Sequence, residues 1–199
     1  MLPQKSTFIL WHTNQRKFKH MKKNVIVFGL ISGIIVSAWM FFSMAKCYDT
    51  QNFEKGMLIG YASMLIAFSF VFVGIKNQRD KYNGGVISFG QAFKTGFFIT
   101  LIASTIYVAV WMIDYYYFIP DFMDKYSEHM ISQAKASGAS EAELAKTLSQ
   151  MATYKEMYKN PLFVILLTYA EILPIGLAIT LISALILKRK PKNDVPAVA

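Results

Sequence analysis

The sequence has few of the residues that form cross-links or metal sites. Its 199 residues include one cysteine, Cys47, and three histidines. A single thiol excludes an internal disulfide and a zinc site built from several cysteines. The histidines lie far apart and none belongs to an HExxH pattern: His12, His20 and His129. We therefore expect no bound metal.

Other catalytic signatures are missing as well. The chain has no GxSxG nucleophile motif and no glycine-rich phosphate-binding loop. No pair of carboxylates occurs inside its long apolar stretches, so general acid–base chemistry has no pair of groups to work with there. We predict that the protein is not an enzyme and needs no cofactor.

Charge is nearly absent from four long stretches, which we predict to span a membrane: residues 25–45, 57–75, 96–117 and 162–187. A helix needs about 20 predominantly apolar residues to cross a bilayer. Apart from Asp114, near the end of the third stretch, the only formal charge within them is Glu171. The sequence thus predicts an all-α integral membrane four-helix bundle, in a single membrane domain of residues 21–190.

The net charge of +9 is distributed unevenly between the connections. The segment before the first span, the second connection and the C-terminal segment together hold 14 basic and two acidic residues, a net charge of +12. The other two connections, counted together with Asp114, hold seven basic and nine acidic residues. Basic residues accumulate on the cytoplasmic side of membrane proteins, so we expect both termini there, including the tail at 191–199. This charge favours the lipid bilayer as partner, and no recognition motif supports nucleic-acid binding.

The first 20 residues show little pattern. Met21 is followed by Lys22 and Lys23 and leads directly into the first span, as a natural start would. We interpret residues 1–20 as a disordered lead-in, or as the result of a start assigned too early. The alternative is a lead-in that lies at the membrane surface.

Small residues recur at four-residue spacing in the first span, at Gly29, Gly33 and Ser37. Such spacing lets another helix approach closely. The second span has a similar series that includes Gly60. Both series predict close helix packing.

The longest polar connection predicts a helical hairpin outside the membrane, at about residues 120–158. Pro120 and Asp121 suit a helix start, and Gly138 suits a helix end. Ser140 with Glu143 matches the capping box that opens a second helix. The apolar face of this hairpin has three candidate partners: its own second helix, the membrane surface or another protein.

Glu171 is the most distinctive residue, because an ionised carboxylate is costly inside a membrane. It lies near the middle of the fourth span, and Pro174 follows it and leaves one backbone carbonyl without its helical donor. We expect the carboxyl group to be buried against the bundle, with Tyr107 and Ser104 of the third span at similar depth. Two interpretations remain open: a proton- or cation-responsive site, and a structural carboxyl that bonds to a neighbouring helix.

A second candidate motif precedes the third span, where Ser88 suits a helix N-cap with Gln91 three residues later. The motif consists of Ser88, Phe89, Gly90, Gln91 and Lys94 within the segment SFGQAFKTG. With this segment, with the Pro-Asp-Phe at 120–122, and with Glu171 followed by Pro174 and Gly176, the chain resembles domain-of-unknown-function family 4199, small four-span membrane proteins of Bacteroidetes. The resemblance covers about residues 22–190. It implies a bacterial inner-membrane location and four helices, and it implies no activity.

From these observations we expect a multi-pass membrane protein of non-enzymatic, accessory or assembly function that acts through the outer hairpin. A membrane-protein partner or a second copy of the chain would bind there. The alternative is a small proton- or cation-linked transporter or channel that uses Glu171.

Overall fold

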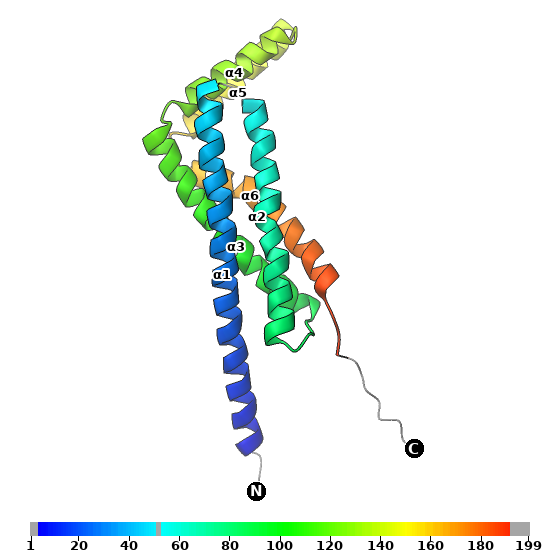
Figure 1. Ribbon diagram of the computed structural model, residues 1–199. Coiled ribbons are helices and arrows are strands. Elements are labelled where there is room, and N and C mark those ends of the chain that lie inside the picture. Colours follow the sequence, from blue (N-terminus) through cyan, green and yellow to red (C-terminus); the bar gives the residue numbers. More distant parts are fainter. Residues whose placement is uncertain (1–3, 51–52, 192–199) are drawn as a thin grey trace.

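The computed structural model describes residues 4–50 and 53–191, and over these residues the fold is helical without a β-strand (Figure 1). Two segments of π-helix, η1 and η2, extend the second and third long helices. One isolated backbone bridge joins Ile87 to Arg189. The elements in chain order are α1 (Gln4–Thr50), α2 (Phe53–Asn77), η1 (Gln78–Tyr82), α3 (Phe89–Ile113), η2 (Asp114–Phe118), α4 (Phe122–Ala136), α5 (Glu141–Met157) and α6 (Pro161–Leu187).

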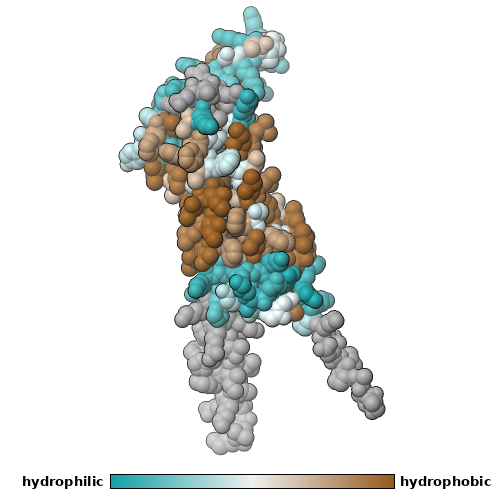
Figure 2. Space-filling view, viewed as in Figure 1, coloured by the Kyte–Doolittle hydropathy of each residue, from teal (hydrophilic) through white to brown (hydrophobic). Residues whose placement is uncertain are grey.

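Four helical segments are long and apolar enough to cross a membrane: His20–Lys46, Phe53–Tyr82, Phe89–Phe118 and Pro161–Leu187. They contain the four predicted spans completely, so the predicted all-α four-span fold is confirmed. Figure 2 shows an apolar band around the middle of the bundle and a hydrophilic band below it. We call the end at Lys22, Lys76 and Lys188 the basic end, and the opposite end, where α4 and α5 lie, the hairpin end (Figure 1).

One expectation for the N-terminal segment is wrong. Helix α1 begins at Gln4 and continues without interruption into the first span. Residues 4–20 are therefore helical, whereas the sequence predicted a disordered lead-in. The alternative start at Met21 stays a prediction, and residues 192–199 of the predicted tail lie outside the described residues.

Helices α1 and α3 pack closely through small residues. A Cβ atom added to Gly29 would lie 2.8 Å from Ile102, and one added to Gly33 would lie 2.6 Å from Ile106. Only hydrogen atoms at these two positions allow such an approach, so the predicted close contact of the first span is confirmed. Gly60 of α2 has open space around it, and no close packing occurs there.

Polar side chains join α1 to α2 near the basic end. The Asn24 amide donates to the carbonyl of Gly74 over 2.8 Å, and the Asn77 amide donates to Asn24 over 2.6 Å. Farther along, the Ser32 hydroxyl donates to the carbonyl of Ala67. Hydrogen bonds of this kind link helices where lipid offers no alternative partner.

The predicted hairpin is present: α4 and α5 are joined by a turn at Gly138 and pack against each other as antiparallel helices. Gly138 has a φ of 74°, a left-handed conformation that glycine adopts without strain. The Ser140 hydroxyl accepts from the Glu143 amide, and the Glu143 carboxylate accepts from the Ser140 amide, so the capping box is confirmed. Lys155 of α5 pairs with Asp124 of α4 and fixes one helix against the other.

Candidate functional site

The contact between α3 and α6 fixes the depth of every residue in the fourth span. A Cβ atom on Gly176 would lie 2.4 Å from the Thr100 methyl group, and one on Gly96 would lie 2.7 Å from the Thr180 methyl group. The Thr100 and Thr180 hydroxyls lie 3.0 Å apart, within hydrogen-bond distance. A glycine of each helix thus packs against a threonine of the other helix, and the two helices lie antiparallel and close together.

This register continues toward the hairpin end, where the Tyr169 hydroxyl donates to Thr105 over 2.9 Å. Ser104 therefore lies level with Glu171, and Tyr107 lies about 4.5 Å nearer the hairpin end, at 1.5 Å rise per residue. Ser104 is fully buried, and its hydroxyl has no hydrogen-bond partner in the described part of the chain. Ser104 and Glu171 thus lie at one depth, and Tyr107 lies within one helical turn of it.

Glu171 itself departs from expectation, because its side chain is exposed and not buried. The reason lies in how α6 packs. Its buried residues advance mainly in steps of four: Val164, Thr168, Ile172, Gly176, Thr180 and Ala184. Each step rotates the contact by about 40° around the helix, so the buried stripe turns away from Glu171. Helix α6 runs unbroken through Pro174, which is also exposed.

Aromatic side chains from several elements gather just beyond this depth. Trp111 and Tyr115 are 7% and 8% exposed and pack inward. The Phe122 ring of α4 lies 5.3 Å from Trp111, measured between ring centroids, and the Tyr158 ring lies 5.4 Å from Tyr115. We call this group the outer aromatic cluster: Phe53, Trp111, Tyr115, Phe122, Tyr126 and Tyr158.

Burial raises the pKa of two phenols in this cluster. Burial raises the pKa of Tyr158 to about 12, and the nearby Glu171 carboxylate contributes to the same shift. The pKa of Tyr126 is raised by burial, by Tyr154 and by Glu171. Tyr107 of α3 is 8% exposed and is packed inside the bundle.

The opposite direction, toward the basic end, is closed. The Phe68 ring of α2 is fully buried, and it lies 2.9 Å from the position of a Cβ on Gly176. Ile172 and Thr100 are also fully buried at this level. Close packing therefore seals the bundle below Glu171, and the carboxyl is accessible only above this seal or from the side.

Comparison with known proteins gives one finding that bears on identity. Residues 27–189 match the family described as Protein of unknown function (DUF4199). The chain belongs to DUF4199. The resemblance read from the inner-loop segment, from Pro-Asp-Phe at 120–122 and from Glu171 with Pro174 is confirmed as to family. No curated protein and no solved structure matches the chain.

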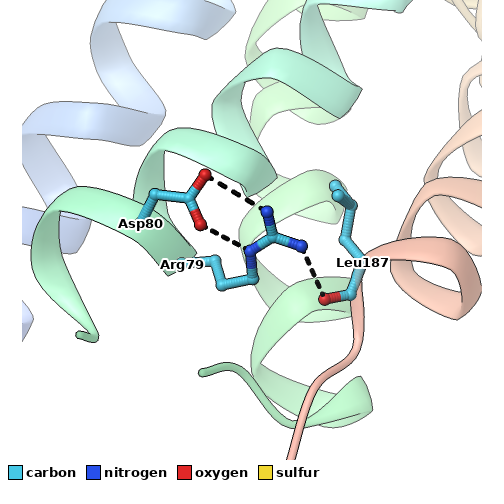
Figure 3. A network of polar contacts seen from close by, with 3 residues as sticks. All are labelled: Arg79, Asp80 and Leu187. Atoms are coloured by element: carbon cyan, nitrogen blue, oxygen red, sulfur yellow. Dashed lines mark hydrogen bonds and ion pairs between the residues drawn. The ribbon is translucent and has the colours of Figure 1, made fainter. Parts of the chain in front are cut away.

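The basic end of this DUF4199 protein is held together by Arg79 (Figure 3). Its guanidinium donates to both carboxylate oxygens of Asp80, over 2.6 and 3.1 Å, and to the carbonyl of Leu187 over 3.5 Å. Ile87 and Arg189 exchange backbone hydrogen bonds of 3.0 and 2.8 Å beside it. The end of α6 is thereby tied to the turn after α2, which makes this network structural.

The inner-loop motif of the DUF4199 chain also has a structural explanation. The Ser88 hydroxyl accepts from the Gln91 amide over 3.3 Å and caps α3, as predicted. Phe89 stacks along the helix on Phe93, with ring centroids 6.0 Å apart. The remaining members, Gly90, Gln91 and Lys94, are exposed at the basic end. The motif begins the third span, and it lies far along α3 from Glu171.

Sequence reasoning missed Tyr126 and Tyr158 as members of the outer aromatic cluster. Both lie in the hairpin, and Tyr126 reaches the cluster because α4 docks on Phe53 of α2. Their helical spacing on the apolar face of the hairpin was the available signal. That face was expected to contact a partner helix, the membrane or another protein, and the two rings pack within the outer aromatic cluster.

Proposed function

We propose that this DUF4199 protein is a non-enzymatic accessory protein of the bacterial inner membrane that binds a partner protein through the α4–α5 hairpin. The observation that supports this most directly is the exposure of apolar side chains on α5. Leu148, Tyr154 and Met157 are 46%, 42% and 43% exposed. They belong to α5, which extends beyond the bundle (Figure 1). Contiguous exposed apolar side chains mark interaction surfaces, and Tyr154 and Met157, three residues apart, lie on one side of α5.

The hairpin is held in position at its base, which favours a binding role. The Phe53 ring at the start of α2 packs against Phe122, Tyr126 and His129, with centroids 6.0, 5.7 and 5.2 Å apart. The side-chain amide of Gln133 in α4 donates to the carboxylate of Glu54 in α2, one residue after Phe53. A partner would therefore meet a surface whose orientation is already set, and little ordering entropy would oppose binding.

The charge of the hairpin favours a protein over a lipid surface. Residues 120–160 contain five lysines and six acidic residues. A segment that binds anionic headgroups carries an excess of basic residues, each contributing about 1 kcal/mol near the surface. The hairpin has no such excess, so its exposed apolar side chains suit the apolar surface of a protein partner.

Co-purification tests this proposal. The change is the triple substitution Leu148→Ser, Tyr154→Ser and Met157→Ser. We expect it to abolish recovery of a stoichiometric partner from native membranes, while far-UV circular dichroism stays unchanged because the replaced side chains are exposed. The matched control replaces three exposed polar residues of the same helix with alanine: Lys146, Ser149 and Gln150. Equal recovery of the partner by both triple variants would contradict a role for the hairpin. Recovery of a second copy of the chain alone would identify a homo-oligomer as the partner.

A second candidate function is favoured by the exposure of Glu171. A carboxylate accessible at this depth, with a closed layer on one side, suits a proton- or cation-linked transporter that binds from the hairpin side. A continuously open channel is disfavoured, because Phe68 and Ile172 fill the path. We expect Glu171→Gln to remove any pH- or cation-dependent flux in proteoliposomes. Flux that is equal in both proteins would rule out this function and leave the hairpin proposal untouched.

A further inference from the structure

We propose that the exposed face of α6 around Glu171 binds the same face of a second copy of this chain inside the membrane, so that the protein forms a symmetric dimer. In this dimer the Glu171 carboxyl of each copy donates a hydrogen bond to the backbone carbonyl of Ala170 in the other copy. The dimer is separate from the binding of a partner by the hairpin. It gives Glu171 a bonding partner that the single chain does not supply.

The Glu171 side of α6 is turned out of the bundle. Gly176 marks the inward side, since it lies against Thr100 of α3. At about 100° per residue, Glu171 lies roughly 140° from Gly176 around the helix. Pro174 and Ala178 lie within about 60° of Glu171, and all three residues are exposed. They therefore form one outward face of the fourth span.

Helix α6 is also the span with the most uncovered surface. Only 22% of its most apolar stretch is buried inside the bundle, against 39% in the first and second spans and 44% in the third. A glutamate within a membrane span almost always faces protein or a water-filled cavity. The exposure of Glu171 on this helix therefore indicates that another protein surface covers it.

Lipid cannot satisfy the carboxyl group at this depth. Glu171 lies ten residues past Pro161, about 15 Å along α6, and hydrocarbon chains offer neither donors nor acceptors. Within residues 4–50 and 53–191, no hydrogen bond or ion pair joins Glu171 to another residue. A neutral carboxyl group has a donor as well as acceptors, so Glu171 needs an acceptor from outside its own chain.

The same region of α6 carries such an acceptor. Pro174 has no amide hydrogen, so the carbonyl of Ala170, four residues earlier, lacks its ordinary helical donor. Ala170 directly precedes Glu171 and is exposed. One donor and one free acceptor thus lie side by side on this surface, and two such surfaces complement each other.

The orientation of a second copy brings these groups together. All copies share the charge distribution that sets orientation, so they insert in the same direction. The axis of a symmetric dimer then runs along the membrane normal, and each residue meets groups at its own depth in the other copy. Every bond in such a contact occurs twice. The adjacent positions of Glu171 and Ala170 meet this condition.

Compact side chains on this surface allow the helices to approach. Ala170, Pro174 and Ala178 recur every four residues, and all three are exposed. Small residues at this spacing let helix backbones come close together in a membrane, and polar side chains then bond across the contact. The surface thus combines the close approach with the hydrogen bonds that hold it.

Energy transfer between copies measures the dimer. Purified full-length protein is labelled with a donor or an acceptor dye at Cys47, its only cysteine. Mixed copies are reconstituted in phosphatidylcholine vesicles and diluted with lipid. We expect the wild type to show transfer that falls on dilution as a monomer–dimer equilibrium does. Glu171→Leu should raise the dissociation constant about tenfold or more, because two hydrogen bonds are lost. Glu171→Gln should dimerise nearly as well as the wild type, because an amide also donates.

Two exposed alanines provide a matched control. Ala170 of α6 and Ala62 of α2 each lie six residues to the hairpin side of the contact between Phe68 and Gly176, so they share one depth on different helices. Ala170→Leu should weaken the dimer about tenfold or more, whereas Ala62→Leu should not. In native membranes, on a Cys47→Ser background, Ala170→Cys should form disulfide-linked dimers on oxidation and Ala62→Cys should not. Far-UV circular dichroism verifies that each variant folds.

The possible outcomes separate this dimer from the other proposals. Equal transfer in the wild type and Glu171→Leu, or equal self-linking of the two cysteine variants, would refute it. Linking of Ala170→Cys only to a different membrane protein would also refute it and would reveal a foreign helix on this face. Transfer lost in the hairpin triple variant but kept in Glu171→Leu would assign self-association to the hairpin. Glu171→Gln keeps the dimer while it is expected to lose flux, so this result and the transport test are independent.

Discussion

The contact of Gly176 with Thr100 allows a quantitative test of the packing between α3 and α6. We consider Gly176→Ala, with Gly60→Ala as the matched control in α2. Both changes add one methyl group and the same helix propensity, about 1 kcal/mol in favour of alanine. Only Gly176 has a neighbour in the way, since its Cβ would lie 2.4 Å from Thr100 and 2.9 Å from Phe68, whereas Gly60 has nothing within 4 Å.

Because the propensity gain is common to both variants, their difference isolates the cost of the clash. Overpacking by one methylene in a filled core costs about 1–3 kcal/mol. For a chain of this size that corresponds to a thermal midpoint about 2–12 °C lower for Gly176→Ala than for Gly60→Ala. The assay is far-UV circular dichroism of both proteins in the same detergent, heated at the same rate.

A second substitution tests whether Thr100 is the cause. Thr100→Ser removes the methyl group that the new Cβ would meet and keeps the hydroxyl that bonds Thr180. In a double-mutant cycle we expect a favourable coupling of about 0.5–3 kcal/mol between Gly176→Ala and Thr100→Ser. Rescue should be incomplete, because Phe68 stays close. Equal midpoints for the two alanine variants, or zero coupling in the cycle, would show that α3 and α6 do not meet as described.

Three other predictions concern the ends of the bundle. Cys47 should react with a membrane-impermeant maleimide in intact spheroplasts, since the hairpin end is expected outside; labelling only after lysis would reverse the orientation. Hydrogen bonds from Ser140 lower the pKa of Glu143. They therefore stabilise the start of α5 fully at pH values above the ordinary pKa of glutamate. This stabilisation is lost as the pH falls through the lowered pKa of Glu143. The protection factor of the amides in the first turn of α5 should therefore fall in acid for the wild type and show no such pH step for Glu143→Gln. Arg79→Ala should speed amide exchange at the end of α6, because Leu187 loses its donor, whereas Lys81→Ala should leave it unchanged.

Local and compositional features of this chain are predictable from its sequence. The four spans follow from long apolar stretches, and the hairpin helices follow from Gly138, Ser140 and Glu143, whose conformations depend on neighbours within a few residues. The close contact of α1 with α3 also follows, because Gly29 and Gly33 leave space that a helix fills.

The surroundings of Glu171 are only partly predictable. Its depth, and that of Tyr107 and Ser104, follow from position along the spans. Its exposure does not, because that depends on the crossing of α3 and α6, which moves the buried stripe away from the carboxyl. The outer aromatic cluster depends on how α4 docks on Phe53, a contact between segments about 70 residues apart in the chain.

The pairing of α3 with α6 has a consequence for biogenesis. Helices α1, α2 and α3 are synthesised first, and the contacts of Gly29 and Gly33 with α3 need nothing that follows. Before α6 arrives, Gly96 of α3 already packs beside Ile75 and Val71 of α2, while the Thr100 hydroxyl lacks Thr180. An ionised Glu171 adds a few kcal/mol to the cost of placing α6 in the membrane. Close packing against α3 and the bond between Thr100 and Thr180 offset part of that cost. The fourth span is thus the last to enter, and the first three act as its template.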